Sequence, residues 1–109
     1  MQRISLEALA RQQLEAAARS GGGRAADTVY GGHEKVLRQT VIALTQGSTL
    51  AEHESPGDAT LLVLRGRVRL TAGEEGWEGR DGDLIIIPET RHAVEALEDS
   101  TFLLTVAKR

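Results

Sequence analysis

VLRGRVRL at residues 63–70 and GDLIIIP at residues 82–88 indicate the fold class most clearly. In the first, Gly66 separates two short runs of strand-forming residues, and in the second, four apolar residues end at Pro88. Similar short runs recur from residue 35 onward, separated by glycine, proline and aspartate. Because no second helical segment crosses over between them, the pattern predicts an all-β antiparallel barrel or sandwich.

The expected strands are short and are divided by turn signals. They cover residues 35–44, 60–64, 67–71, 77–79, 84–87, 92–97 and 101–107, with turns at residues 46–48, 55–58, 73–76 and 81–83. Residues 61–64 and 84–87 are apolar at every position, so both faces of these two strands are expected to be covered. The N-terminal helix or a second subunit would provide the outer cover, and we therefore expect a homodimer.

The N-terminal segment differs from the rest and is expected to form one short α-helix. Ser5 is a favourable N-cap residue, because its hydroxyl can accept a hydrogen bond from a free backbone N–H one turn on. An apolar stripe follows it at Leu6, Leu9, Ala10, Leu14 and Ala17. The glycines after Ser20 are expected to end the helix, with a mobile linker over residues 20–26. The predicted organisation is a helix and linker over residues 1–23 and a barrel over residues 24–109.

Composition excludes several classes of function. The 109 residues suffice for one domain, and 13 basic against 16 acidic side chains, without a basic stripe, predict no nucleic-acid partner. No apolar run is long enough to cross a bilayer, and the first residues lack the apolar core of a signal peptide, so no membrane partner is expected. The absence of cysteine excludes disulfides and thiol catalysis, and the expected location is cytoplasmic.

Two spaced patterns carry a resemblance to a known family. The first runs from Gly47 through five residues to His53 and on to Gly66, and the second runs from Gly82 through five residues to Pro88 and on to His92. In this combination the chain, from about residue 36 to its end, resembles the cupin superfamily. The resemblance implies a double-stranded β-helix, a jelly-roll barrel of the RmlC-like type, with one short N-terminal α-helix outside it.

Metal-binding cupins hold one ion with three histidines and one carboxylate at the barrel mouth. The resemblance places His53 and His92 at the first and last ligand positions, and implies that these two would hold a divalent iron, manganese, nickel or zinc ion. Ser55 stands where the second histidine is expected, and its hydroxyl is a poor ligand for these ions. The carboxylate position falls on Ala59, or on Thr60 if the gap is counted one residue longer.

Other polar side chains are candidates for lining the same cavity. Gln39 lies on an early strand, and together with His53, Ser55 and His92 it makes up the expected ligand-binding set. Glu54 would need a bulge to turn it inward, since in a regular strand it would point to the face opposite to that of its neighbour His53.

Three functions follow from these residues. The first is a barrel that binds a small molecule or serves assembly, with a degenerate metal site. The alternative is a metal-dependent enzyme of the dioxygenase, isomerase or decarboxylase type that uses His53 and His92. The third is a regulatory protein that contacts a partner through its N-terminal helix. No hydrolase or phosphotransferase motif is present, and Trp77 is expected to pack in the core or at the rim.

Overall fold

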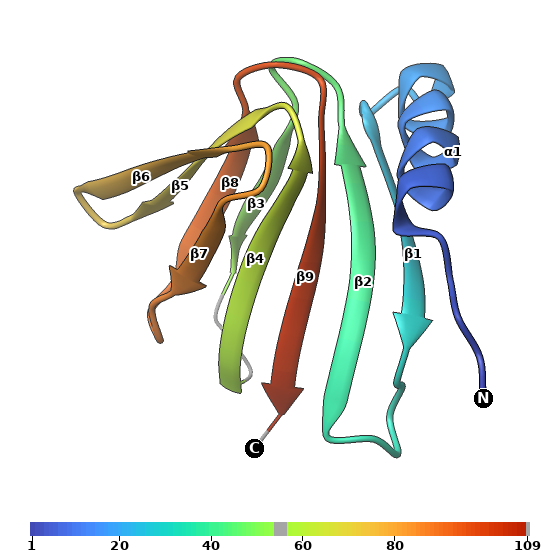
Figure 1. Ribbon diagram of the computed structural model, residues 1–109. Coiled ribbons are helices and arrows are strands. Elements are labelled where there is room, and N and C mark those ends of the chain that lie inside the picture. The colour runs from blue at the N-terminus through green and yellow to red at the C-terminus, as the bar shows by residue number, and fades with distance from the viewer. Residues whose placement is uncertain (54–56, 109) are drawn as a thin grey trace.

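The computed structural model describes residues 1–53 and 57–108, and in this part of the chain one helix precedes nine strands (Figure 1). The elements are α1 (Leu6–Arg19), β1 (Arg24–Tyr30), β2 (Leu37–Leu44), β3 (Thr49–His53), β4 (Gly57–Arg65), β5 (Arg67–Ala72), β6 (Glu75–Arg80), β7 (Leu84–Ile87), β8 (His92–Ala96) and β9 (Ser100–Lys108). Among the described residues, no helix has the length and apolar character that crossing a membrane requires.

The strands form two antiparallel sheets that enclose one core. The first sheet has the order β1-β2-β9-β4-β7, and the second has the order β3-β8-β5-β6. Strands that are distant in sequence are neighbours, as where β9 lies between β2 and β4 (Figure 1). The expectation of an all-β antiparallel architecture with one N-terminal helix is therefore confirmed.

The core forms because alternate residues of each strand point into the space between the sheets. In β4, Ala59, Leu61 and Val63 are buried, while the residues between them face outward. Phe102 of β9 is the largest fully buried side chain and lies in the same cluster. The cluster consists of Ile42, Leu44, Ala59, Leu61, Val63, Val68, Leu70, Ile85, Ile87, Val94, Ala96, Phe102 and Val106.

The helix begins as the sequence predicts and covers the outer face of the first sheet. The Ser5 hydroxyl accepts a hydrogen bond from the backbone N–H of Ala8 at 3.2 Å, which satisfies one of the free donors of the first turn. Ala10 packs against Val41 of β2 and Leu103 of β9, so a second apolar cluster lies outside the barrel. The helix therefore supplies part of the outer cover that the apolar strands require.

The mobile linker predicted for residues 20–26 is wrong for its second half. Arg24 to Ala26 belong to β1, which pairs with β2 along most of its length. The segment has a polar, weakly strand-forming sequence, so its structure comes from pairing with β2 at the sheet edge rather than from local preference. The turn expected at residues 55–58 is also incomplete, since Gly57 and Asp58 open β4, while residues 55 and 56 lie outside the described part.

The strand over residues 84–87 is buried on one face only. Ile85 and Ile87 point into the core, whereas Leu84 and Ile86 are 57% and 69% exposed. This strand, β7, is the last in its sheet, and α1 packs on the strands at the opposite edge (Figure 1). The outer cover expected here is therefore not supplied by the helix.

Candidate functional site

His92, the first residue of β8, points into the barrel and is only 3% exposed. It shares a face with Val94 and Ala96, both of which belong to the core. Its Nδ1 lies 2.9 Å from the backbone oxygen of Thr90. Because a carbonyl oxygen only accepts, Nδ1 carries the proton of this hydrogen bond, and in the neutral ring Nε2 then holds the lone pair.

The structure brings the two predicted histidine positions together in the sheet register. His53 ends β3, and its Cα is paired with that of His92 across the β3–β8 ladder. A bulge between Leu50 and His53 shifts the register by one residue, and without it the two positions would not be partners. Ser55 and Glu54, the other candidates for this site, lie outside the described residues.

The position expected to carry the metal-binding carboxylate holds a methyl group. Ala59 is buried in the core and is paired with Ile87 on one side and Val106 on the other. Thr60, the other possible position, has the opposite orientation and faces outward. Among the residues that the structure describes, no three histidine, aspartate or glutamate side chains gather closely enough to hold an ion. The described residues therefore do not fit the ligand set of three histidines and a carboxylate.

Gln39 is not part of this site. It shares a face of β2 with Val41, which packs against the helix, so its side chain lies on the outer face of the first sheet. There its Nε2 donates a hydrogen bond to Oγ1 of Thr105 at 3.2 Å. The prediction that Gln39 lines the cavity is wrong because it required the other strand register, and a shift of one residue exchanges the two faces.

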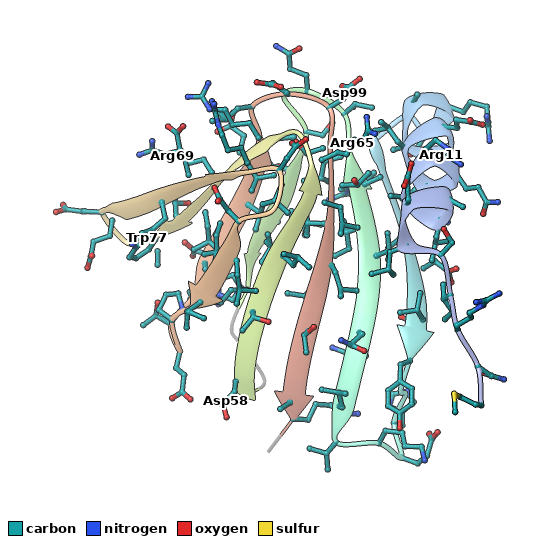
Figure 2. All side chains as sticks on the ribbon, viewed as in Figure 1. Arg11, Asp58, Arg65, Arg69, Trp77 and Asp99 are labelled. Carbon is teal, nitrogen blue, oxygen red and sulfur yellow. The ribbon has the colours of Figure 1, made fainter. Side chains whose placement is uncertain are left out.

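A groove of about 410 Å³ opens at the rim of the barrel beside the loop that leads to His92. Its residues come from β3, the β5–β6 hairpin and the β7–β8 loop, and they are Glu52, Ala72, Gly73, Glu75, Trp77, Pro88, Thr90 and Arg91. Trp77 is paired with the core residue Leu70 but remains 40% exposed. Figure 2 shows that it lies on the hairpin of β5 and β6, which projects beyond the rest of the barrel.

An ion pair closes one side of this rim groove. Nε of Arg91 lies 2.9 Å from Oε1 of Glu52, and the pair joins the β7–β8 loop to β3. Of the residues that the structure describes in this groove, one is therefore a cation and two are carboxylates, since Glu75 also lines it. The sequence predicts Trp77 at the rim or in the core, but it carries no signal for the groove, because the groove depends on how far the hairpin extends.

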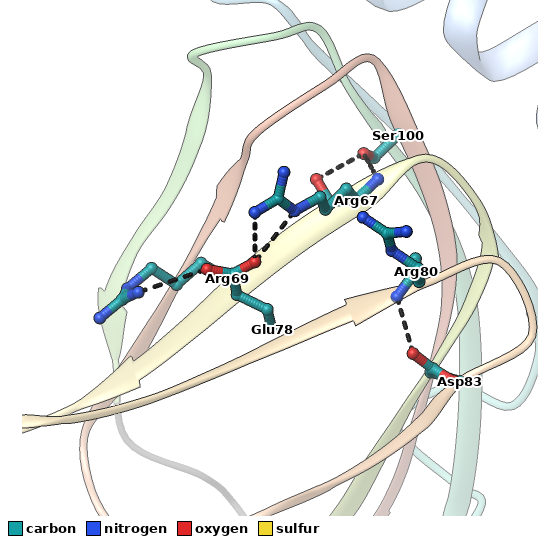
Figure 3. A network of polar contacts seen from close by, with 6 residues as sticks. All are labelled: Arg67, Arg69, Glu78, Arg80, Asp83 and Ser100. Carbon is teal, nitrogen blue, oxygen red and sulfur yellow. Dashed lines mark hydrogen bonds and ion pairs between the residues drawn. The ribbon is translucent and has the colours of Figure 1, made fainter.

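The outer face of the second sheet carries a separate polar network (Figure 3). Arg67 and Arg69 of β5 both reach Glu78 of β6, with Nη2 of Arg67 2.6 Å from Oε1 and Nη1 of Arg69 3.6 Å from Oε2. The hydrogen bond from Arg67, with the nearby arginine charges, lowers the pKa of the exposed Glu78 carboxyl below its ordinary value. These two arginines therefore belong to a solvated face and not to the rim groove.

The fold of this chain is similar to the folds of several solved structures. No protein-family model matches the sequence, and no curated protein matches it. A conserved protein of unknown function from Streptococcus pyogenes is 30% identical, with a TM-score of 0.74 over 83% of this chain and 78% of that chain.

Two further structures resemble the chain at lower sequence identity. An RmlC-like cupin family protein with a double-stranded β-helix fold, from Methanocaldococcus jannaschii, is 15% identical, with a TM-score of 0.70 over 83% of this chain and 84% of that chain. A salicylate 1,2-dioxygenase from Pseudoaminobacter salicylatoxidans, in complex with gentisate, is 16% identical, with a TM-score of 0.77 over 92% of this chain and 32% of that one. The predicted double-stranded β-helix is thereby confirmed.

Proposed function

The chain belongs to the cupin superfamily, and on that premise we propose that its barrel binds a small organic molecule at the rim and does not build the metal centre of metal-binding cupins. The observation that carries the proposal is the buried methyl group of Ala59 at the inward-facing carboxylate position. In place of a metal-binding mouth, the described residues offer the rim groove beside Trp77. A volume of about 410 Å³ lies within the range of small-molecule sites.

The side chains of the groove favour a neutral molecule with several hydroxyl groups and one apolar ring face. The exposed Trp77 ring can stack on such a face, as amphipathic aromatic residues do at binding surfaces. Carboxylates of Glu52 and Glu75 accept hydrogen bonds from hydroxyl groups, and the Thr90 hydroxyl, which donates its proton to the Arg91 carbonyl at 3.4 Å, can accept one as well. Since two carboxylates face one arginine, an anionic molecule is repelled relative to a neutral one. Sugars in the ring form have this chemistry.

His92 is a positioning residue in this proposal. Its hydrogen bond to the Thr90 oxygen anchors the loop whose Thr90 and Arg91 line the groove. A ring held in this way at the base of the loop fixes the wall of the site without touching the ligand.

A metal-dependent enzyme is the alternative, of the dioxygenase, isomerase or decarboxylase type. The geometry of His92 favours it, because metal-binding histidines commonly donate one ring N–H to a carbonyl and present the other nitrogen to the ion. The register that places His53 opposite His92 also favours it. Fe(II), Mn(II), Ni(II) or Zn(II) would suit two imidazoles, but the remaining ligands would have to come from outside the described residues.

Fluorescence gives a direct test, because Trp77 is the one tryptophan in the sequence. We expect D-glucose or D-galactose to change the Trp77 emission in a saturable way, and glucuronate to bind more weakly because of its charge. Glu75→Ala should weaken sugar binding, while Glu74→Ala changes the neighbouring carboxylate, which does not line the groove, and should leave it unchanged. The proposed ligand class is contradicted if neither sugar changes the Trp77 emission, or if glucuronate binds more tightly than the neutral sugars.

We also propose that the protein is a cytoplasmic homodimer. The lack of cysteine in the sequence supports the location. For the dimer, β7 ends its sheet with Leu84 and Ile86 exposed, and an antiparallel strand edge can pair with its own copy about a two-fold axis. Light scattering should give twice the chain mass for the native protein, and a monomer mass for Ile86→Lys with its circular dichroism unchanged. A native monomer contradicts the dimer.

A further inference from the structure

A second groove, of about 370 Å³, lies outside the barrel between α1 and the outer face of the first sheet. The residues that line it are Glu7, Ala10, Arg11, Leu14, Leu64, Arg65, Asp81 and Thr101. It shares none of them with the rim groove at Trp77. Figure 2 shows Arg11 on α1 and Arg65 at the end of β4, at the same end of the molecule.

Thr101 contributes a buried hydroxyl without a partner. The residue is 2% exposed, and its Oγ1 makes no hydrogen bond with any residue that the structure describes. It shares the helix-facing side of β9 with Leu103, so the hydroxyl lies on the side of the groove. Buried polar atoms are nearly always hydrogen-bonded, and an unpaired one calls for a specific explanation. A bound molecule that pairs with this hydroxyl supplies one.

Arg65 places a cation next to that hydroxyl. Its Cα is the register partner of Thr101 across β4 and β9, so the two side chains leave the sheet on the same face. Within the described chain, the Arg65 guanidinium makes no hydrogen bond or ion pair. The other charged side chains described in the groove already have partners: Arg11 pairs with Glu7 at 3.2 Å, and Asp81 Oδ1 accepts a hydrogen bond from the Gly66 N–H at 2.7 Å.

The rest of the groove is apolar. Ala10 and Leu14 of α1 face Leu64 of β4 across it. A molecule that fills this space therefore needs an apolar chain or ring as well as a polar end. The volume of the groove lies near the lower limit of small-molecule sites, so the bound molecule is limited to a short chain or a single ring.

We propose that this helix–sheet groove binds a small carboxylic acid with an apolar tail. The carboxylate pairs with the Arg65 guanidinium and accepts a hydrogen bond from Oγ1 of Thr101, and the tail lies along Leu14 and Leu64. A charge-assisted hydrogen bond of this kind is about twice as strong as a neutral one, which makes the carboxylate the preferred polar end. The site is separate from the rim groove and does not depend on the function proposed there.

The test uses sodium octanoate as the probe and amide chemical shifts of the full-length protein as the readout. Saturable shifts are expected at Ala10, Leu64 and Thr101, without a change in Trp77 emission. Arg65→Gln should weaken octanoate binding by about tenfold or more, since it removes the charge from the polar contact. Arg69→Gln, the same change on the opposite sheet, should leave binding unchanged.

Two further comparisons show whether the polar side chains of the groove, and not only its apolar surface, bind the ligand. The uncharged 1-octanol should bind more weakly than octanoate, and Thr101→Val should weaken octanoate binding while Thr101→Ser, which keeps the hydroxyl, should retain it. Equal binding of octanoate by Arg65→Gln and the native protein would overturn the proposal. So would tighter binding of 1-octanol, or the absence of saturable shifts in the native protein at millimolar octanoate.

Discussion

His53 and His92 are register partners across β3 and β8, and this relationship depends on the bulge that follows Leu50. The sheet thus keeps two positions of the metal-binding pattern together, although the buried Ala59, at the position expected for the carboxylate, carries no ligand atom. Two imidazoles without a carboxylate make a weaker and less selective site than the full set. The buried His92 has a structural task in any case, because it anchors the loop at Thr90.

His92→Ala should both destabilise the fold and weaken ligand binding in the rim groove. The substitution removes a buried ring and its hydrogen bond to Thr90, which we expect to lower the free energy of unfolding by about 2–4 kcal/mol. Urea denaturation measures the loss. His33→Ala is the matched control, since His33 is exposed, and it should change stability by less than about 0.5 kcal/mol. Equal stability of the two variants would mean that the His92 hydrogen bond contributes nothing.

Gly66→Ala should cost more stability than Gly47→Ala. Both glycines have positive φ, +97° at Gly66 and +85° at Gly47, so alanine is strained at either position. At Gly66 an added Cβ would also meet the backbone of Asp99 and Ser100, whereas at Gly47 nothing lies within 4 Å. We expect about 1 kcal/mol from strain at Gly47 and at least about 3 kcal/mol at Gly66. Thermal and urea denaturation of the two variants provide the comparison.

Thr101→Val should stabilise the protein in the absence of a ligand. Valine has nearly the same shape and replaces the unpaired buried hydroxyl with a methyl group, for an expected gain of about 1 kcal/mol. Thr105→Val is the contrast, because its hydroxyl accepts a hydrogen bond from Gln39 and its removal should lower stability by about 0.5–1 kcal/mol. If Thr101→Val is less stable than the native protein, the Thr101 hydroxyl has a hydrogen-bond partner in solution.

Glu78→Gln should change how stability depends on pH in acid. The pKa of Glu78 is lowered in the folded state from its ordinary value of 4.5, chiefly by the hydrogen bond from Arg67, so the folded state binds this proton less readily than the unfolded state. The stabilisation is therefore fully present above pH 4.5 and is lost as the pH falls through the folded-state pKa. The difference between native and Glu78→Gln should be constant near neutrality and vanish in acid.

Glu74→Gln serves as the control for this titration. Glu74 is an exposed carboxylate for which the described residues provide no ion pair. Its stability difference from the native protein should stay small at every pH, since exposed unpaired charges contribute little. If the stability difference from the native protein vanishes in acid in the same way for both variants, net charge and not the Arg67 contact causes the pH dependence.

The sequence predicts most of the strands, because glycine, proline and aspartate divide the chain at the points where it turns. It also predicts Ser5 as the helix cap, since capping depends on contacts within one turn. The strands β1 and β3 escape prediction. The polar residues of β1 are held by pairing with β2 and have little strand preference of their own, and β3 is held by pairing with β8 through an irregular register.

The sites are harder to predict than the strands. The prediction of Gln39 in the cavity fails because the register, which decides the face of a strand, is not visible in a single sequence. The groove at Trp77 and the unpaired hydroxyl of Thr101 depend on how a hairpin and a helix lie against the barrel. Neither arrangement leaves a local signal in the residues themselves.

Metal content distinguishes a barrel that binds organic molecules from a metal-dependent enzyme. Tag-free protein, produced with iron, manganese, nickel and zinc and purified without chelator, is compared by elemental analysis with the His53→Ala/His92→Ala double variant and with His33→Ala. A barrel that binds organic molecules without a metal centre should contain far less than one ion per chain, with the same content in all three proteins. About one transition-metal ion per chain in the native protein and in His33→Ala, lost only in the double variant, would rule out a barrel without a metal centre and favour the metal-dependent alternative.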